Sequence, residues 1–184
     1  MDWEYRGMTF ARVRALIVVV VLFVTAGVVV IMAIQRDTQT PAAAKAACTA
    51  GLVPAKIKMP ERNAVSINVF NGTSRVGLAE QVAGDFKNRG FNIKKTETAP
   101  DNQKSDQIAE INYGPEAVGA ASLVSAYFLV DEAKMHFDIK RKGSEVNVVI
   151  GEKFQQLATT TEVNQSIAAL GNPLPPAGTC EANQ

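Results

Sequence analysis

The sequence predicts an α+β fold, a two-layer sandwich in which two helices cover one face of a mixed β-sheet. Three observations predict it. Short runs alternate apolar and polar residues, as strands do, and two longer stretches carry apolar residues at helical spacing. These segments follow one another in the order β-α-β-β-α-β-β. Two helices on one face of a sheet bury the apolar surfaces of both layers economically.

The first strand and the first helix lie between residues 65 and 90. Val65, Ile67 and Val69 alternate with Ser66, Asn68 and Phe70, which indicates a strand. The helix that follows has one apolar stripe, which consists of Leu78, Ala79, Val82, Ala83 and Phe86. Gly90 is expected to end this helix in the left-handed conformation, with Phe91 packed against the last turn.

The remaining elements follow in order. Residues 91–96 and 107–113 are predicted strands, separated by a polar loop over 97–106. Pro115 suits the first turn of a second helix. Its apolar stripe consists of Ala117, Ala120, Ala121, Val124 and Phe128. Residues 134–151 are predicted to form a β-hairpin, and a last short helix is expected over 159–171, closed by Gly171.

A transmembrane helix is expected before this domain. The uncharged apolar run from Ala15 to Ile34 has the length that a helix needs to span a bilayer. Arg6, Arg12 and Arg14 precede it, so residues 1–14 are predicted to be cytoplasmic and the rest extracytoplasmic. A cleaved signal peptide is the alternative, but its apolar region is normally shorter. Residues 35–63 are predicted to form a linker, with the stretch from Leu52 to Asn63 extended or irregular.

The two cysteines, Cys48 and Cys180, are both expected outside the membrane, where disulfides persist. A bond between them would tie the C-terminal segment, residues 158–184, back to the linker. The alternative is two free or intermolecular thiols. An even number of cysteines in this compartment favours the bond.

The charge of the chain is balanced, with 19 basic and 18 acidic residues. This balance does not favour nucleic acid as a partner. The only histidine is His136, predicted to face solvent on a strand. No cluster of cysteine and histidine has metal-binding spacing, and no acid/base pair or nucleophile motif is recognisable. We therefore expect no metal, no cofactor and no enzymatic activity.

A glycine-containing loop follows the first strand. Gly72 and Gly77 have the spacing of a phosphate-binding loop, but Leu78 and Ala79 stand where such a loop needs lysine and a hydroxyl residue. This excludes a nucleotide-hydrolysing site. Two interpretations remain, a structural turn and a site for an anionic envelope ligand at a helix N-terminus. The candidate ligand-binding residues are Asn71, Gly72, Thr73, Ser74, Arg75 and Gly77.

The structural interpretation assigns a role to each part of this loop. Asn71-Gly72 accepts positive φ and would turn the chain sharply off the strand. Thr73 or Ser74 would cap backbone N–H groups, and Gly77 would let the helix start close to the sheet. A candidate basic patch for an anionic polymer or lipid consists of Lys94, Lys95, Lys140, Arg141 and Lys142; the alternative is a set of solvated charges.

Five short motifs of the chain resemble those of a known family. Residues 65–95 carry the strand ending "NGT", the helix start "GLA" and the second-strand start "GF", and "EINYG" and "VNVVIGEKF" follow later. This pattern resembles the LytR C-terminal domain over about residues 65–157, and we place the domain at 64–157. The layout of one helix plus this domain is similar to single-pass actinobacterial cell-envelope integrity proteins.

The resemblance implies a non-catalytic protein of the cell membrane. Its extracytoplasmic domain would bind peptidoglycan, an attached anionic glycopolymer or envelope-assembly proteins, and would support envelope integrity. The family brings no catalytic residues to this chain. The alternative is an accessory or enzymatic role in the transfer of phosphate-linked glycopolymers to peptidoglycan.

Overall fold

The computed structural model describes residues 17–25, 27–28, 48, 51–100, 104–129 and 132–182. The chain divides into two compact units, residues 1–43 and 44–184. In the first unit, residues 17–25 and 27–28 are helical. Within the described ranges, no helix combines the length and the apolar character needed to cross a membrane. The other positions of the predicted span over 15–34, and the predicted cytoplasmic segment over 1–14, lie outside the described residues.

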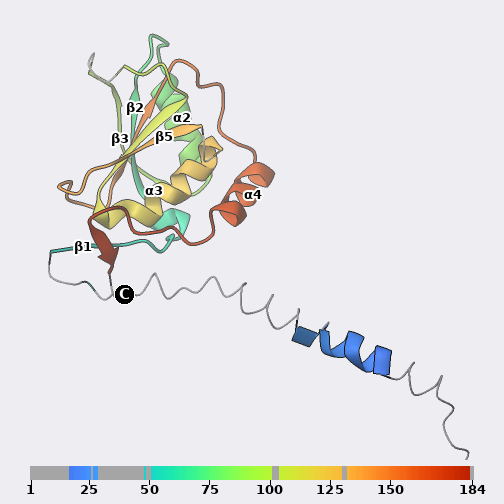
Figure 1. The fold of residues 1–184 in the computed structure, drawn as a ribbon. Helices are drawn as coiled ribbons and strands as arrows, with labels where there is room; N and C mark the ends of the chain where they lie inside the picture. Colours follow the sequence, from blue (N-terminus) through green and yellow to red (C-terminus); the bar gives the residue numbers. More distant parts are fainter. Residues whose placement is uncertain are drawn as a thin grey trace, which may run out of the picture. The chain divides into compact units, whose positions relative to one another are not determined.

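The second unit contains a five-stranded mixed sheet with the order β3-β2-β6-β4-β5 (Figure 1). Its strands are β2 (Ser66–Asn71), β3 (Asn92–Thr98), β4 (Ala109–Tyr113), β5 (Ala133–Phe137) and β6 (Val146–Ile150). Strand β2 runs parallel to both β3 and β6. Strand β4 is antiparallel to β6 and parallel to β5. The mixed sheet and the predicted order of its strands and helices are confirmed.

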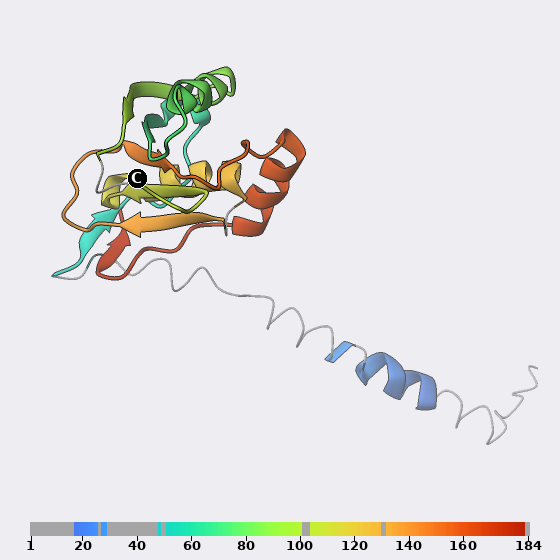
Figure 2. The same ribbon diagram turned by 90° about the horizontal axis from the view of Figure 1, so that it is seen from above.

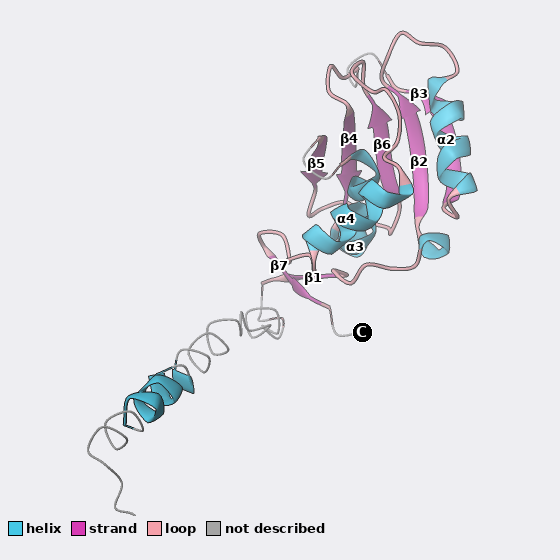
Figure 3. Ribbon diagram, turned by 90° about the vertical axis from the view of Figure 1, so that its right-hand side faces the viewer, coloured by secondary structure: helices cyan, strands magenta, loops and turns pink. Residues whose placement is uncertain are grey.

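Helices cover one face of this sheet (Figure 3). They are α2 (Leu78–Asn88), α3 (Val118–Ser125) and α4 (Thr160–Leu170), with short 3₁₀ turns η2 (Arg62–Ala64), η4 (Pro115–Ala117) and η5 (Ala126–Phe128). The core lies between the helices and the sheet and includes Ile67 and Val69 of β2, which are fully buried. Phe86, Phe91, Tyr127 and Phe128 contact one another there, with ring centroids 5.0–5.9 Å apart in the contacting pairs.

The ends of the helices follow local rules. Gly90, with φ 92°, ends the turn after α2, and Phe91 packs edge-on against Phe86, as predicted. The predicted last helix is α4, and a capping box starts it: the Glu162 N–H donates to Thr159 Oγ1, and the Thr159 N–H donates to the Glu162 carboxylate. Hydrogen bonds from the backbone and side chain of Thr159 lower the pKa of Glu162.

The predicted hairpin over 134–151 is wrong, because β5 and β6 are not neighbours. Strand β4 lies between them, and β5 forms an edge of the sheet. Strand β6 is largely buried on both faces: Val148 and Ile150 point into the core, and Val149 on the other face is only 3% exposed. A strand with two buried faces is stabilised in the middle of a sheet. The half-exposed β5 is suited to the edge.

A second, two-stranded sheet joins the linker to the C-terminal segment (Figure 2). Strand β1 (Val53–Ala55) pairs in parallel with β7 (Thr179–Glu181). The chain then packs on α3, where the Lys56 N–H donates to the Pro115 carbonyl and the Gly119 N–H donates to the Lys56 carbonyl, both at 2.9 Å. The stretch from Leu52 to Asn63, predicted to be extended or irregular, therefore holds β1 and part of η2. It covers a side of α3 that lies outside the predicted apolar stripe of that helix.

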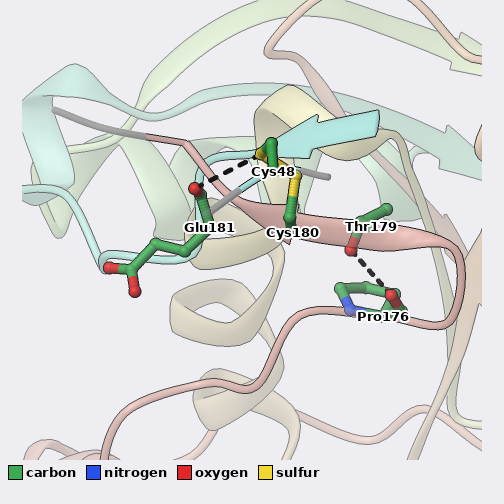
Figure 4. The surroundings of a disulfide bond; sticks show 5 residues. All are labelled: Cys48, Pro176, Thr179, Cys180 and Glu181. Carbon is green, nitrogen blue, oxygen red and sulfur yellow. Dashed lines mark hydrogen bonds between the residues drawn. A yellow bond between two sulfur atoms is a disulfide. The ribbon is translucent and has the colours of Figure 1, made fainter. Parts of the chain in front are cut away.

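The predicted disulfide between Cys48 and Cys180 is present (Figure 4). The two Cα atoms are 5.3 Å apart across a sequence separation of 132. Cys180 is buried within β7, and the Thr179 hydroxyl beside it donates to the Pro176 carbonyl at 2.7 Å. The bond therefore closes the small β1–β7 sheet with a covalent link.

Candidate functional site

The conformation of the loop after β2 is fixed by hydrogen bonds between its own side chains and backbone. Asn71 and Thr73 are 7% and 5% exposed. Asn71 Oδ1 accepts hydrogen bonds from the Thr73 N–H (3.0 Å) and the Thr73 hydroxyl (2.7 Å), and Thr73 Oγ1 accepts from the Arg75 N–H at 3.0 Å. Asparagine and threonine form such local turns readily. The predicted capping role of Thr73 is confirmed.

The predicted backbone roles of the glycines are wrong. The left-handed conformation falls at Gly77, with φ 76°, and not at Asn71 or Gly72. A Cβ added to Gly77 would meet no atom within 4 Å, so this glycine does not serve a close approach to the sheet. The Asn71 side chain already turns the chain off β2, and the reversal into α2 needs positive φ only at the residue that precedes the helix.

The donors of this loop are largely used within the fold. The N–H and hydroxyl of Ser74 both donate to Glu152 Oε1, at 2.8 and 3.2 Å. Arg75 Nη2 donates to the carbonyl of Phe154 at 2.8 Å. An internal carboxylate thus stands where an external anion was expected, and these contacts favour the structural interpretation of the loop. An anion site at residues 71–77 stays a prediction.

Replacing Thr73 by valine is expected to destabilise the domain by about 1–3 kcal/mol, because the substitution keeps the shape but removes a buried hydroxyl that donates to Asn71 Oδ1 and accepts from the Arg75 N–H. Urea denaturation followed by circular dichroism measures the change. Thr98→Val, at an exposed position of β3, is the matched control and should change stability by less than about 0.5 kcal/mol. Equal effects of the two substitutions would contradict the role given to Thr73.

The five residues of the predicted basic patch do not come together. Lys94 and Lys95 lie on β3, one edge of the sheet, and residues 140–142 follow β5, the other edge. Three strands lie between these edges. The connection from β5 to β6 passes close to Gly114, where an added Cβ would lie 2.5 Å from the Arg141 carbonyl oxygen. Arg141 therefore lies beside the face of the sheet that no helix covers, which we call the helix-free face. It lines a groove there, and Lys94 is not among the residues that line that groove.

The helix-free face carries two rows of side chains that cross all five strands. The strand register places Lys95, Asn68, Asn147, Asn112 and His136 side by side in one row. It places Glu97, Phe70, Val149, Glu110 and Lys134 in the next. Neighbouring strands lie about 4.8 Å apart, so the three central asparagines form a continuous strip of amide groups across β2, β6 and β4.

A polar groove of about 270 Å³ lies over this strip. Its lining consists of Phe70, Lys104, Glu110, Asn112, Arg141, Asn147 and Val149. Asn68 is 6% exposed, and its Nδ2 donates to Asn147 Oδ1 at 2.9 Å. Its Oδ1 has no hydrogen-bond partner among the described residues. The groove thus combines amides, charges of both signs and an apolar floor of Phe70 and Val149.

Glu110, which lines the groove, contacts a serine on one side and a histidine on the other. The Ser105 hydroxyl donates to Glu110 Oε1 at 2.7 Å, and His136 Nε2 lies 3.4 Å from Glu110 Oε2. A nucleophilic serine needs the histidine as its direct base. Here the carboxylate lies between the two, and Ser105 is only 5% exposed. In the part of the chain that the structure describes, no group of three or more potential ligands could hold a metal ion.

Sequence reasoning missed this groove, although a signal was available. Asparagine is depleted in strands, yet β2, β4 and β6 each carry one at a position that alternates with core residues. The alternation identifies the outward face of each strand. Only the register shows that the three asparagines lie in a single row.

The structure defines a two-layer α/β domain with a polar, helix-free sheet face. Residues 64–154 match the family model described as LytR cell envelope-related transcriptional attenuator. The domain over residues 64–154 belongs to the LytR C-terminal domain family, as the sequence motifs predicted. No curated protein matches the chain. A similar solved structure is the soluble domain of a conserved hypothetical secreted protein from Mycobacterium marinum, with 24% identity, 69% of this chain and 83% of that chain covered, and a TM-score of 0.48.

Proposed function

We propose that this chain is a non-catalytic, membrane-anchored cell-envelope protein whose domain binds a cell-wall glycan on the helix-free face of the sheet. The observation that carries the proposal is the polar groove lined by Asn112 and Asn147, which form one row with Asn68 across three strands. The description of the matched family, which names the cell envelope, supports the proposed location.

The chemistry of the groove suits a saccharide. An amide side chain offers both donors and acceptors, and the hydroxyl and acetamido groups of a sugar need both. Phe70, which is partly exposed, provides apolar surface for the C–H face of a sugar ring, and Arg141 would pair with an acidic substituent. A few placed polar groups over an apolar floor are typical of small-molecule sites.

Anchorage would make weak binding sufficient. The apolar run over residues 15–34 would hold the domain at the outer surface of the cell membrane, close to the inner wall. Tethering raises the effective concentration of a domain near its ligand without any new contact. Such a protein would support envelope integrity by linking membrane and wall. The order of Ser105, Glu110 and His136 supports a non-catalytic role.

Asn112→Ala is expected to weaken binding to isolated peptidoglycan at least tenfold, because the half-buried amide between Asn147 and His136 in the row loses its donors and acceptor. Co-sedimentation of the full-length chain, in detergent micelles, with purified sacculi measures the affinity. Asn164→Ala, at an exposed position of α4, is the matched control and should bind as the unmodified chain does.

Thermal denaturation must show that the Asn112→Ala chain is folded. If the unmodified chain does not sediment with sacculi, or if Asn112→Ala binds unchanged, the proposed glycan site is wrong. Release of pyrophosphate-linked lipid by the purified chain would favour the enzymatic alternative instead.

A further inference from the structure

A second groove, of about 530 Å³, runs between α2 and the edge strand β3 (Figure 3 shows both elements side by side). Its lining consists of Ala83, Gly84 and Lys87 of the helix, followed by Phe91, Asn92, Ile93, Lys94, Lys95 and Thr96. The residues of α2 and β3 are in extensive contact, so the groove is a furrow along one packed pair of elements.

Strand β3 offers backbone groups along this groove. It ends the five-stranded sheet and pairs only with β2 among the described strands. A strand that is paired on one side leaves alternate N–H and C=O groups pointing away from the sheet. An extended peptide recognises such an edge by adding one more strand.

Gly84 keeps the groove open at a cost to the fold. Glycine in the middle of a helix is less favourable than alanine, and Gly84 lies in the middle of α2. A Cβ at this position would meet no atom within 4 Å, so no contact inside the domain requires glycine here. The missing side chain instead widens the furrow beside β3, which provides room for an additional strand.

The charged residues that line this groove are basic: Lys87, Lys94 and Lys95. Lys95 Nζ also lies 3.9 Å from Glu97 Oε1, so the positive charge of the groove comes mainly from Lys87 and Lys94. Lys94 is the extra residue of a bulge in the pairing between β2 and β3, since Ile67 pairs with Ile93 and Asn68 with Lys95. Lysines and a bulge at an edge discourage unwanted strand pairing. They also favour a segment that brings negative charge.

We propose that the furrow between α2 and β3 is a docking site for an extended acidic peptide segment of a partner protein, which adds to the sheet beside β3. This site shares Lys95 with the end of the asparagine row but includes none of the three asparagines, and it does not depend on glycan binding. The edge backbone favours a peptide over an anionic polymer, because only a peptide matches the repeat of N–H and C=O groups along a strand.

The test uses the full-length chain in detergent micelles and a dye-labelled eight-residue peptide that alternates glutamate and valine. Fluorescence polarisation is expected to show binding at least tenfold tighter than that of the same peptide with lysine in place of glutamate. Two further peptides carry N-methyl groups at the odd or at the even residues. In an added strand, the N–H groups of every second residue would point at β3. One of these two peptides is therefore expected to lose binding and the other to keep it.

Two substitutions place the site on the chain. Gly84→Leu fills the furrow and is expected to weaken peptide binding at least tenfold, while Ala168→Leu, at an exposed position of α4, leaves it unchanged. Lys94→Glu is expected to weaken binding and Lys58→Glu, at an exposed position after β1, to have little effect. Thermal denaturation of each chain shows whether it is folded.

Three results would overturn the proposal. The first is no binding of the glutamate–valine peptide at millimolar concentration. The second is equal binding of both N-methylated peptides together with equal binding of polyphosphate, which would indicate a surface for anionic polymers. The third is unchanged binding by the folded Gly84→Leu chain. None of these results bears on the sedimentation with sacculi, so the two proposals fail separately.

Discussion

Gly119→Ala is expected to destabilise the domain by about 3 kcal/mol or more. A Cβ at this position of α3 would lie 2.1 Å from the Lys58 carbonyl oxygen and 2.7 Å from that of Ile57. Both are backbone atoms, so the segment after β1 would have to leave the helix. It would then lose the hydrogen bonds between Lys56 and the backbone of Pro115 and Gly119. Overpacking a core costs about 1–3 kcal/mol, and each lost hydrogen bond adds about 1 kcal/mol.

Gly84→Ala provides the matched control, because it makes the same substitution in another helix at a position with open space. It is expected to stabilise the domain by about 0.5–1 kcal/mol through helix propensity. Urea denaturation under identical conditions compares the two chains. Similar effects of the two substitutions, in either direction, would contradict the packing of residues 56–58 on α3.

Loss of the disulfide is the second large effect expected. The loop closed by Cys48 and Cys180 has a sequence separation of 132, for which chain entropy predicts about 5 kcal/mol. Measured losses of native disulfides are typically about 2–5 kcal/mol, and we expect the Cys48→Ser, Cys180→Ser chain to fall in that range. The bond also holds β1 against β7, so their pairing should open first.

Two measurements test these expectations. Urea denaturation compares the double-serine chain with the unmodified chain, with and without a reductant. The double-serine chain should not respond to the reductant. Hydrogen exchange should be accelerated first at the Val53 N–H, which donates to the Gly178 carbonyl, and at the Ala182 N–H, which donates to the Ala55 carbonyl. Unchanged stability together with unchanged exchange at these two groups would contradict the role given to the bond.

The elements of the fold could be predicted because their signals are local. Strand β2 alternates over Val65, Ile67 and Val69, and α2 has one apolar stripe that ends at Gly90. The pairing of β5 and β6 could not be predicted in this way. Two alternating runs joined by a turn resemble a hairpin whether or not another strand enters between them. The entry of β4 depends on contacts between residues far apart in the chain.

The candidate site shows the same division. The residues of the 71–77 loop were identified from glycine spacing, but the sequence does not show that Glu152 and the carbonyl of Phe154 occupy its donors. Lys94 and Arg141 are both basic, yet the sheet order puts them at different places. The groove over Asn112 went unrecognised because each asparagine by itself is an ordinary outward-facing residue.

Periodicity, glycine positions, the cysteine count and the family segments in the chain alone were enough to identify the strands of the five-stranded sheet, the helices, the closing disulfide and the family, but not β1 and β7. These properties depend on a few neighbouring residues or, for the disulfide, on the number of cysteines and the compartment expected for them. Folding added the neighbours of each strand, the burial of α3 under residues 56–58 and the row of asparagines. Those features arise from register and packing between segments that are far apart in the chain. The burial of Val149 favours a central place for β6 in the sheet, and the missing side chain of Gly119 lets residues 57 and 58 pack on α3.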